Sequence, residues 1–211
     1  VWYRARSGKA LVGNHALEEK YNLEDALVIS EFMNVFINNA NVVKMANLAQ
    51  LVNVIAPIFT SKTGMYKQTI YYPFQLFAEH DHGVALKPYV RCKTYNTNKF
   101  VIGINERKKQ LNNVPYLDVS STYNKGQVVI NVVNRNKDKS IKTNIISETG
   151  HFKGHFKVYQ IDGPNIKSKN DFNHTSVKTE EKHGFNSNGQ KFTYSFPPHS
   201  FTMLIGHISR K

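Results

Sequence analysis

Apolar and polar positions in the first third of the chain follow the spacing of helices. Leu23 to Asn39 carries apolar residues at helical intervals, and Asn22 before it is a good N-cap with two acidic residues in the first turn. A second helix is expected over about Thr69 to His80, where Pro73 is tolerated if it lies in the first turn. The first helix has a wide apolar side, so we expect it to pack against a large partner.

The stretch Val42 to Pro57 is apolar but carries amides at every third position, Asn47, Gln50 and Asn53. Such amides cost free energy in apolar surroundings unless they are hydrogen-bonded. One interpretation is a buried parallel strand over Val42 to Ala46 whose carboxyl end delivers two of the amides to a site. The other is a short amphipathic helix with one polar stripe, and periodicity alone does not separate the two. The flanking helices favour the strand, because helix, strand, helix is typical of a parallel sheet covered by helices.

From Ala85 onward the pattern alternates with period two, which indicates strands. The sequence Asn124-Lys125-Gly126-Gln127 predicts a hairpin turn whose second strand runs over Val128 to Val133. Several short strands at this spacing predict an antiparallel sandwich. Further strands are expected at Ile141 to Ile146, Phe152 to Gln160, Phe192 to Phe196 and Phe201 to Ile205, and a long excursion or loose loop at Lys167 to Gln190.

The charge suggests a nucleic-acid partner, but its distribution does not. The 211 residues carry a formal net charge of +13, which would attract the phosphates of a nucleic acid. Hydrophobic residues make up 40% of the chain, which is enough for a core in one large or two small domains. The basic groups, such as Arg107-Lys108-Lys109, are scattered through turn-rich sequence without a nucleic-acid-binding motif, so a solvated lysine-rich surface is favoured. No run reaches membrane-spanning length, and the start of the chain has no apolar signal region. The compartment stays open between cytoplasmic and periplasmic or secreted.

The sequence His80-Asp81-His82 contains residue types that bind zinc. A third convergent ligand is not apparent, and Gly83 follows directly, so a polar cap at a helix end is the favoured interpretation. The single cysteine, Cys92, excludes an internal disulfide. We therefore expect neither a metal nor a cofactor.

Several segments resemble one known family. The run YNLEDALVISEFMNVFINNANVVKMANLAQLVNVIAPIF, followed by YYPFQLFAEHDHG, closely resembles the late barrel segment of family 51 glycoside hydrolases, the α-L-arabinofuranosidases. The pieces VPYLDVSSTY, VVINVVNRN and FPPHSFTML resemble the C-terminal β-sandwich of that family. The resemblance implies an α/β plus all-β architecture, with the end of a (β/α)₈ barrel over residues 1–84 and an antiparallel jelly-roll-like sandwich over residues 85–211.

The resemblance also implies an activity and a set of site residues. Family members are retaining enzymes that remove terminal non-reducing α-L-arabinofuranosyl residues from arabinoxylan or arabinan oligosaccharides, commonly as homo-oligomers. Trp2 matches a tryptophan that lines the sugar pocket, and Gln50 matches a glutamine that hydrogen-bonds the sugar; Asn47 and His15 are further candidates. Both catalytic glutamates of the family are expected upstream of Val1, so no catalytic residue is assigned within the chain.

Two other function classes stay open at this point. One is a non-catalytic carbohydrate-binding or structural sandwich, and the other is a basic nucleic-acid-binding module. Neither accounts for the helical first third. We further expect the segment from Ala85 onward to close its own core, and residues 1–83 to leave large side chains such as Phe32 and Phe36 without partners.

Overall fold

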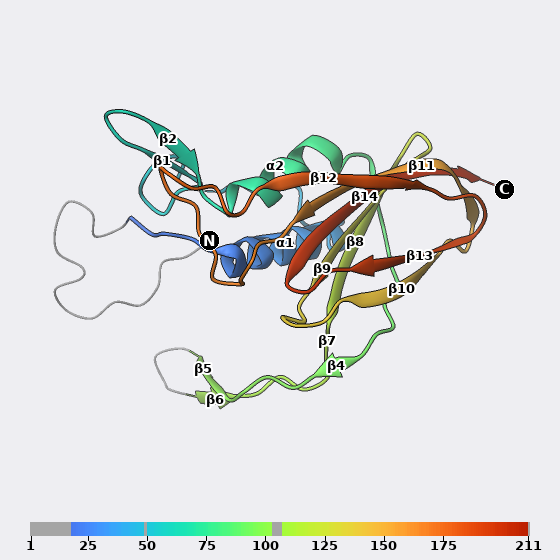
Figure 1. Ribbon diagram of the computed structural model, residues 1–211. Coiled ribbons are helices and arrows are strands. Elements are labelled where there is room, and N and C mark those ends of the chain that lie inside the picture. Colours follow the sequence, from blue (N-terminus) through green and yellow to red (C-terminus); the bar gives the residue numbers. More distant parts are fainter. Residues whose placement is uncertain (1–17, 49, 103–106, 211) are drawn as a thin grey trace.

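The computed structural model describes residues 18–48, 50–102 and 107–210, and these form a mostly β structure in which two helices lie along one face of a sheet (Figure 1). Helix α1 spans Leu23–Asn38, and helix α2 spans Tyr71–His80. At the start of α1 the Asn22 side chain accepts from the amide of Asp25 at 3.3 Å, and the Asp25 carboxylate accepts from the amide of Asn22 at 2.8 Å. Pro73 lies in the first turn of α2. Both predicted helices are confirmed.

The central sheet has six antiparallel strands in the order β12-β11-β14-β9-β8-β3. Its strands are β3 (Val84–Leu86), β8 (Leu117–Asn124), β9 (Gln127–Asn134), β11 (Gly150–Ile161), β12 (Thr179–Asn186) and β14 (Ser200–Arg210). A second sheet pairs β10 (Ile141–Ile146) with β13 (Lys191–Phe196). The strands predicted at these places are confirmed, and the arrangement is sandwich-like (Figure 1).

Three small antiparallel pairs lie outside these two sheets. They are β1 (Ile58–Thr60) with β2 (Met65–Lys67), β4 (Thr94–Tyr95) with β7 (Val114–Pro115), and β5 (Phe100–Ile102) with β6 (Arg107–Lys109). The last two pairs belong to one long excursion that extends away from the sandwich (Figure 1).

The hairpin between β8 and β9 turns through two residues with positive φ. Lys125 has φ +46° and Gly126 has φ +92°, while Asn124 and Gln127 pair on either side. A two-residue turn of this kind matches the right-handed twist of the strands that it joins. The hairpin predicted from these four residues is confirmed.

Two cores form on opposite faces of the central sheet. The helix-side core joins residues of both helices to the sheet, and the sandwich-side core lies between the central sheet and β10–β13. Strand β14 contributes to both with period two, since Phe201, Met203 and Ile205 belong to the first and Leu204 to the second. The helix-side core contains Leu23, Ala26, Leu27, Leu76, Phe77, Val129, Val133, Ile161, Val177, Phe201, Met203 and Ile205.

The strand predicted over Val42 to Ala46 is wrong. Residues 43–48 have no regular secondary structure, and the side chains of Val42 and Met45 are 70% and 79% exposed. The alternative, an amphipathic helix, does not form either. A parallel strand needs hydrogen-bonding neighbours, and the described residues supply none along this stretch.

The tract Lys167 to Gln190 is not a loose loop, because it contains β12 and binds the start of α1. The amides of Leu23 and Glu24 donate to the carbonyls of Ser168 and Ile166, each at 2.9 Å. Further along, the Asn170 side-chain amide donates to the carbonyl of Val177 at 2.7 Å. The polar composition of the tract was misleading, because β12 pairs its backbone with β11 and the preceding residues bind α1.

The segment from Ala85 onward closes a core of its own, the sandwich-side core, as expected. The helix-side core, in contrast, is shared by α1, α2 and the sheet. The division between residues 84 and 85 itself stays a prediction. None of the helices in the described ranges is long and apolar enough to cross a membrane.

Substitution of Phe77 by alanine tests whether the helices and the sheet unfold together. Phe77 is 3% exposed and stacks on Phe201 with ring centroids 5.2 Å apart. Phe77→Ala should lower the free energy of unfolding by about 3–5 kcal/mol because a large buried side chain leaves a cavity. In urea unfolding, far-UV circular dichroism and tyrosine fluorescence should shift together.

Tyr89→Ala is the control, since Tyr89 is 89% exposed and its removal should change the unfolding free energy by less than ~0.5 kcal/mol. Loss of the helical signal at low urea while the sheet signal keeps its original midpoint would show that the two parts are independent.

Candidate functional site

The candidate sugar-binding residues within the described chain lie on the stretch between α1 and β1. Asn47 and Gln50 are both exposed there. Exposed amides of this kind can donate to and accept from the hydroxyl groups of a sugar. The other two candidates, Trp2 and His15, lie outside the described residues, so their distance from Gln50 is not defined.

Asn53, the third amide of this stretch, has a structural role. Its side-chain oxygen accepts from the amide of Thr60 at 2.7 Å, and its side-chain nitrogen donates to the Thr60 hydroxyl at 3.2 Å. Its φ is +62°, a conformation that asparagine tolerates better than most residues. Asn53 therefore fixes the turn that brings the chain from Gln50 into β1.

Two partly buried side chains anchor the stretch against the rest of the protein. Leu48 and Ile55 pack against a third small core made of Tyr21, Ile29 and Ile70. Gln50 lies between these two anchors in sequence. The anchors restrict where the exposed amides can lie, although the stretch has no helix or strand of its own.

Gln68 joins three segments beneath this stretch. It is 1% exposed, and its side-chain oxygen accepts from the amide of Tyr21 at 2.8 Å. Its side-chain nitrogen donates to the carbonyls of Glu19 at 2.9 Å and Ala56 at 2.7 Å. Hydrogen bonds are directional, so these bonds fix the position of the segment before α1 and of the end of the stretch at Ala56. No pattern in the sequence distinguishes Gln68 from a solvated amide.

A second polar cluster joins α1 to β8 and β9. The Asn34 side-chain nitrogen donates to the Asp118 carboxylate at 2.8 Å, and its oxygen accepts from the Ser120 hydroxyl at 2.7 Å. The Asn131 amide in turn donates to Ser120 at 3.1 Å and to both carboxylate oxygens of Asp81 at 3.0 Å. The chain of bonds thus reaches from α1 across two strands to the residue after α2.

The His80-Asp81-His82 sequence directs its three side chains to different partners. Asp81 accepts from Asn131 and Thr122, His80 stacks on Tyr159 at a centroid distance of 5.2 Å, and a ring nitrogen of His82 lies 3.1 Å from the Glu79 carbonyl. The last contact is the helix-end capping that we predict from the sequence. In the ranges that the structure describes, no group of three or more His, Cys, Asp or Glu side chains is placed to hold a metal.

Comparison with known proteins identifies the family. Residues 1–200 match the model of the alpha-L-arabinofuranosidase C-terminal domain. The chain belongs to this family. It is 34% identical over 198 residues to a probable alpha-L-arabinofuranosidase C of Aspergillus terreus, covering 91% of this chain and 36% of that relative. It is 29% identical over 216 residues to the intracellular exo-alpha-(1->5)-L-arabinofuranosidase 1 of Bacillus subtilis, covering 97% of this chain and 40% of that protein.

Solved structures agree with this assignment. The arabinose complex of alpha-L-arabinofuranosidase from Thermotoga maritima superposes with a TM-score of 0.81 at 28% identity, covering 97% of this chain and 41% of that chain. The GH51 alpha-L-arabinofuranosidase from Thermotoga petrophila gives a TM-score of 0.82 at 28% identity, with the same coverage. The chain therefore spans well under half the length of these relatives.

Two carboxylates of this arabinofuranosidase C-terminal domain converge on Arg135. Its Nε lies 2.6 Å from Glu31, and one of its terminal nitrogens lies 3.1 Å from Asp118. Burial raises the pKa of the Glu31 carboxyl, which Arg135 opposes through its charge and its hydrogen bond. A retaining glycosidase needs one carboxylate free to attack and one carboxyl free to protonate the leaving oxygen. Because the guanidinium binds both, Glu31 and Asp118 form a structural ion cluster.

Asp81 should make the stability of this domain depend on pH. Burial raises the pKa of its carboxyl from 3.8 to about 6, although Asn131 and Thr122 donate hydrogen bonds to it. The unfolded chain releases this proton at lower pH than the folded chain does, so the free energy of unfolding falls as pH rises from about 4 to 6. The side chain in Asp81→Asn is neutral at every pH, so the variant does not lose this stability as pH rises. The unfolding free energy of the variant, relative to that of the unmodified chain, should therefore increase by roughly 2–3 kcal/mol between pH 4 and 7.5.

Urea denaturation at several pH values measures this difference. Asp138→Asn, at an exposed turn, controls for the change in net charge. A difference between Asp81→Asn and the unmodified chain that stays constant with pH would contradict the prediction.

Proposed function

We propose that this chain is the C-terminal part of a retaining α-L-arabinofuranosidase. The complete enzyme removes terminal non-reducing α-L-arabinofuranosyl residues from arabinoxylan or arabinan oligosaccharides, and it does so as a homo-oligomer without a cofactor and without a nucleic-acid or membrane partner. The observation that carries this proposal is the family match over residues 1–200, together with the superposition of 97% of the chain on an arabinofuranosidase.

In this proposal residues 1–84 are the last elements of a (β/α)₈ barrel, and residues 85–211 form a jelly-roll-like sandwich. Large apolar side chains on and after α1 support the barrel assignment. Phe32, Val35, Met45 and Leu51 are all exposed in this chain. Large apolar side chains that are exposed along one segment are expected where that segment packs against other protein, here the remaining barrel elements.

The sugar-contacting residues in the complete enzyme are Trp2 and Gln50, with Asn47 and His15 as further candidates. A tryptophan ring covers the apolar C–H face of a sugar, and a glutamine amide bonds its hydroxyls. Support for Gln50 comes from its exposure between the anchors Leu48 and Ile55. The nucleophile and the acid/base group would be two carboxyl groups about 5–5.5 Å apart, supplied by other parts of the enzyme.

The 211-residue chain alone should not hydrolyse an aryl α-L-arabinofuranoside, whereas the longer protein that contains it should. The chain offers no carboxylate pair that matches the family motif, and the two-step displacement requires both groups. The assay follows release of the aryl group, and nuclear magnetic resonance follows the configuration of the released arabinose. Turnover at ordinary enzyme rates by the purified chain, or none by the longer protein, would refute the proposal.

In the longer protein, Gln50→Ala should cost about 1–3 kcal/mol of transition-state stabilisation, measured as a fall in kcat/KM, with little change in Tm. Asn53→Ala is the matched variant on the same stretch. It removes the two bonds to Thr60, so it should lower Tm. Normal kcat/KM and a large fall in Tm for Gln50→Ala would mean that Gln50, like Asn53, is structural.

A further inference from the structure

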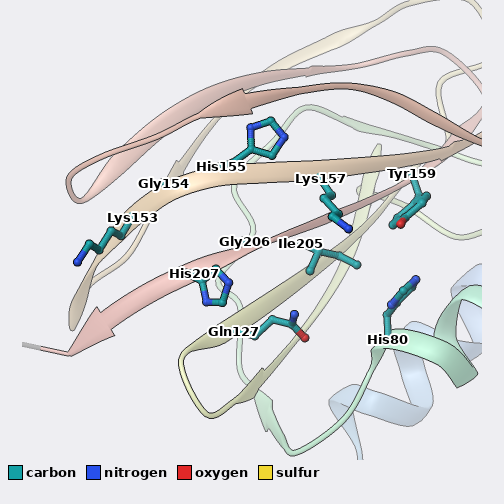
Figure 2. A pocket seen from close by; sticks show the side chains of 10 residues that line it. All are labelled: His80, Gln127, Lys153, Gly154, His155, Lys157, Tyr159, Ile205, Gly206 and His207. Carbon is teal, nitrogen blue, oxygen red and sulfur yellow. The ribbon is translucent and has the colours of Figure 1, made fainter.

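Beyond the end of α2, the helix-side face of the sheet continues as an open hollow of about 540 Å³ (Figure 2). It is lined by residues of β11, by Ile205 to His207 in the middle of β14, by the first residue of β9 and by the last residue of α2. In Figure 2 the side chains of Lys157, Gln127 and His80 lie around this space, Lys153 lies toward its outer end, and His155 projects from the other side of β11. The hollow is separate from the stretch that carries Gln50.

Positive charge dominates the hollow. Of its ten lining residues, Lys153 and Lys157 carry a formal positive charge at neutral pH, three others are histidine, and none is acidic. In the part of the chain that the structure describes, neither Lys153 nor Lys157 takes part in an ion pair. Glu181, which pairs with Tyr159 across the strands, lies outside the lining. These cations are therefore available to an anionic ligand.

A bulge in β11 positions the basic residues. Lys153 pairs with His207 and Lys157 with Ile205, so three residues of β11 lie opposite Gly206 alone. The ring of Phe156 fills the place of a side chain at Gly206, where a Cβ would lie 2.3 Å from it. On the other neighbouring strand a Cβ at Gly184 would lie 2.3 Å from a ring nitrogen of His155.

These two glycines allow the bulge to pack tightly. Bulges redirect side chains and are frequent beside functional sites. The bulge sets the spacing between Lys153 and Lys157 on β11, and the glycines of the two neighbouring strands leave room for it.

An aromatic wall closes the end of the hollow near α2. The rings of His80 and Tyr159 stack with an interplanar angle of 14°. Burial lowers the pKa of His80, and the charge of Lys157 contributes in the same direction. Opposite the wall, Gln127 pairs with His207 across β9 and β14 and presents an amide.

We propose that this hollow binds a carboxylate-bearing sugar, namely a uronic acid residue of an acidic oligosaccharide. Ammonium groups of Lys153 and Lys157 would bind the carboxylate, the stacked rings would cover the apolar face of the sugar, and Gln127 would bond its hydroxyls. Inorganic phosphate would interact with the two lysines but would gain nothing from the stacked rings. The inference concerns binding and not turnover, so it stands or fails independently of the proposed hydrolysis.

Titration calorimetry of the 211-residue chain with trigalacturonic acid tests the site, with a neutral arabinotriose and inorganic phosphate as comparison ligands. Lys153→Gln/Lys157→Gln should weaken trigalacturonic acid binding by about tenfold or more. The matched control is Lys142→Gln/Lys191→Gln, which removes the same charge from exposed positions of β10 and β13 and should leave binding nearly unchanged. Thermal unfolding confirms that both variants are folded.

Three results would overturn the proposal. They are no measurable binding of trigalacturonic acid, equal weakening in both double variants, and phosphate or arabinotriose binding as tightly as trigalacturonic acid. Equal weakening would mean that net charge alone attracts the ligand. Because salt screens such attraction everywhere on the surface, the titrations are run at physiological ionic strength.

Discussion

The central strands of this sheet are apolar on both faces, and this constrains the rest of the structure. On β9, Val129 and Val133 face the helices, while Val128 and Val132 face the second sheet. A sheet that is apolar on both sides is stable only when both sides are covered. The helices α1 and α2 and the pair β10–β13 are therefore equally necessary, although they come from distant parts of the chain.

The sequence predicts those elements whose signal is local. Both helices follow from their spacing and from the Asn22 cap. The β8–β9 hairpin follows from the turn residues around Gly126, because glycine adopts the required positive φ without strain. The strand over Val42 to Ala46 failed for the opposite reason. Its apolar content is compatible with a strand, but a parallel strand exists only through neighbours elsewhere in a sheet.

Site geometry was less predictable, because it depends on single long-range hydrogen bonds. Asn47, Gln50 and Asn53 look alike in sequence, yet Asn53 binds Thr60 while the other two are exposed. Gln68 bonds to two segments that both precede it in the chain by more than ten residues, and no periodicity marks such a residue. The assignment of Gln50 rests on resemblance to the family, since spacing predicted only that these three amides would behave alike.

Polar contacts complement the apolar cores by fixing the position of the helices on the sheet. Apolar burial would hold α1 against the sheet in several neighbouring positions, because the hydrophobic effect is not directional. The bonds of Asn34 to Asp118 and Ser120 require one position, since a displaced helix would leave buried polar groups without partners. Asp81 fixes the end of α2 in the same way, through its bonds to Asn131 and Thr122. Burial of its carboxyl costs desolvation free energy, which is why its pKa is raised. The helix-side core thus supplies the free energy of docking, and the polar chain from Asn34 to Asp81 selects its geometry.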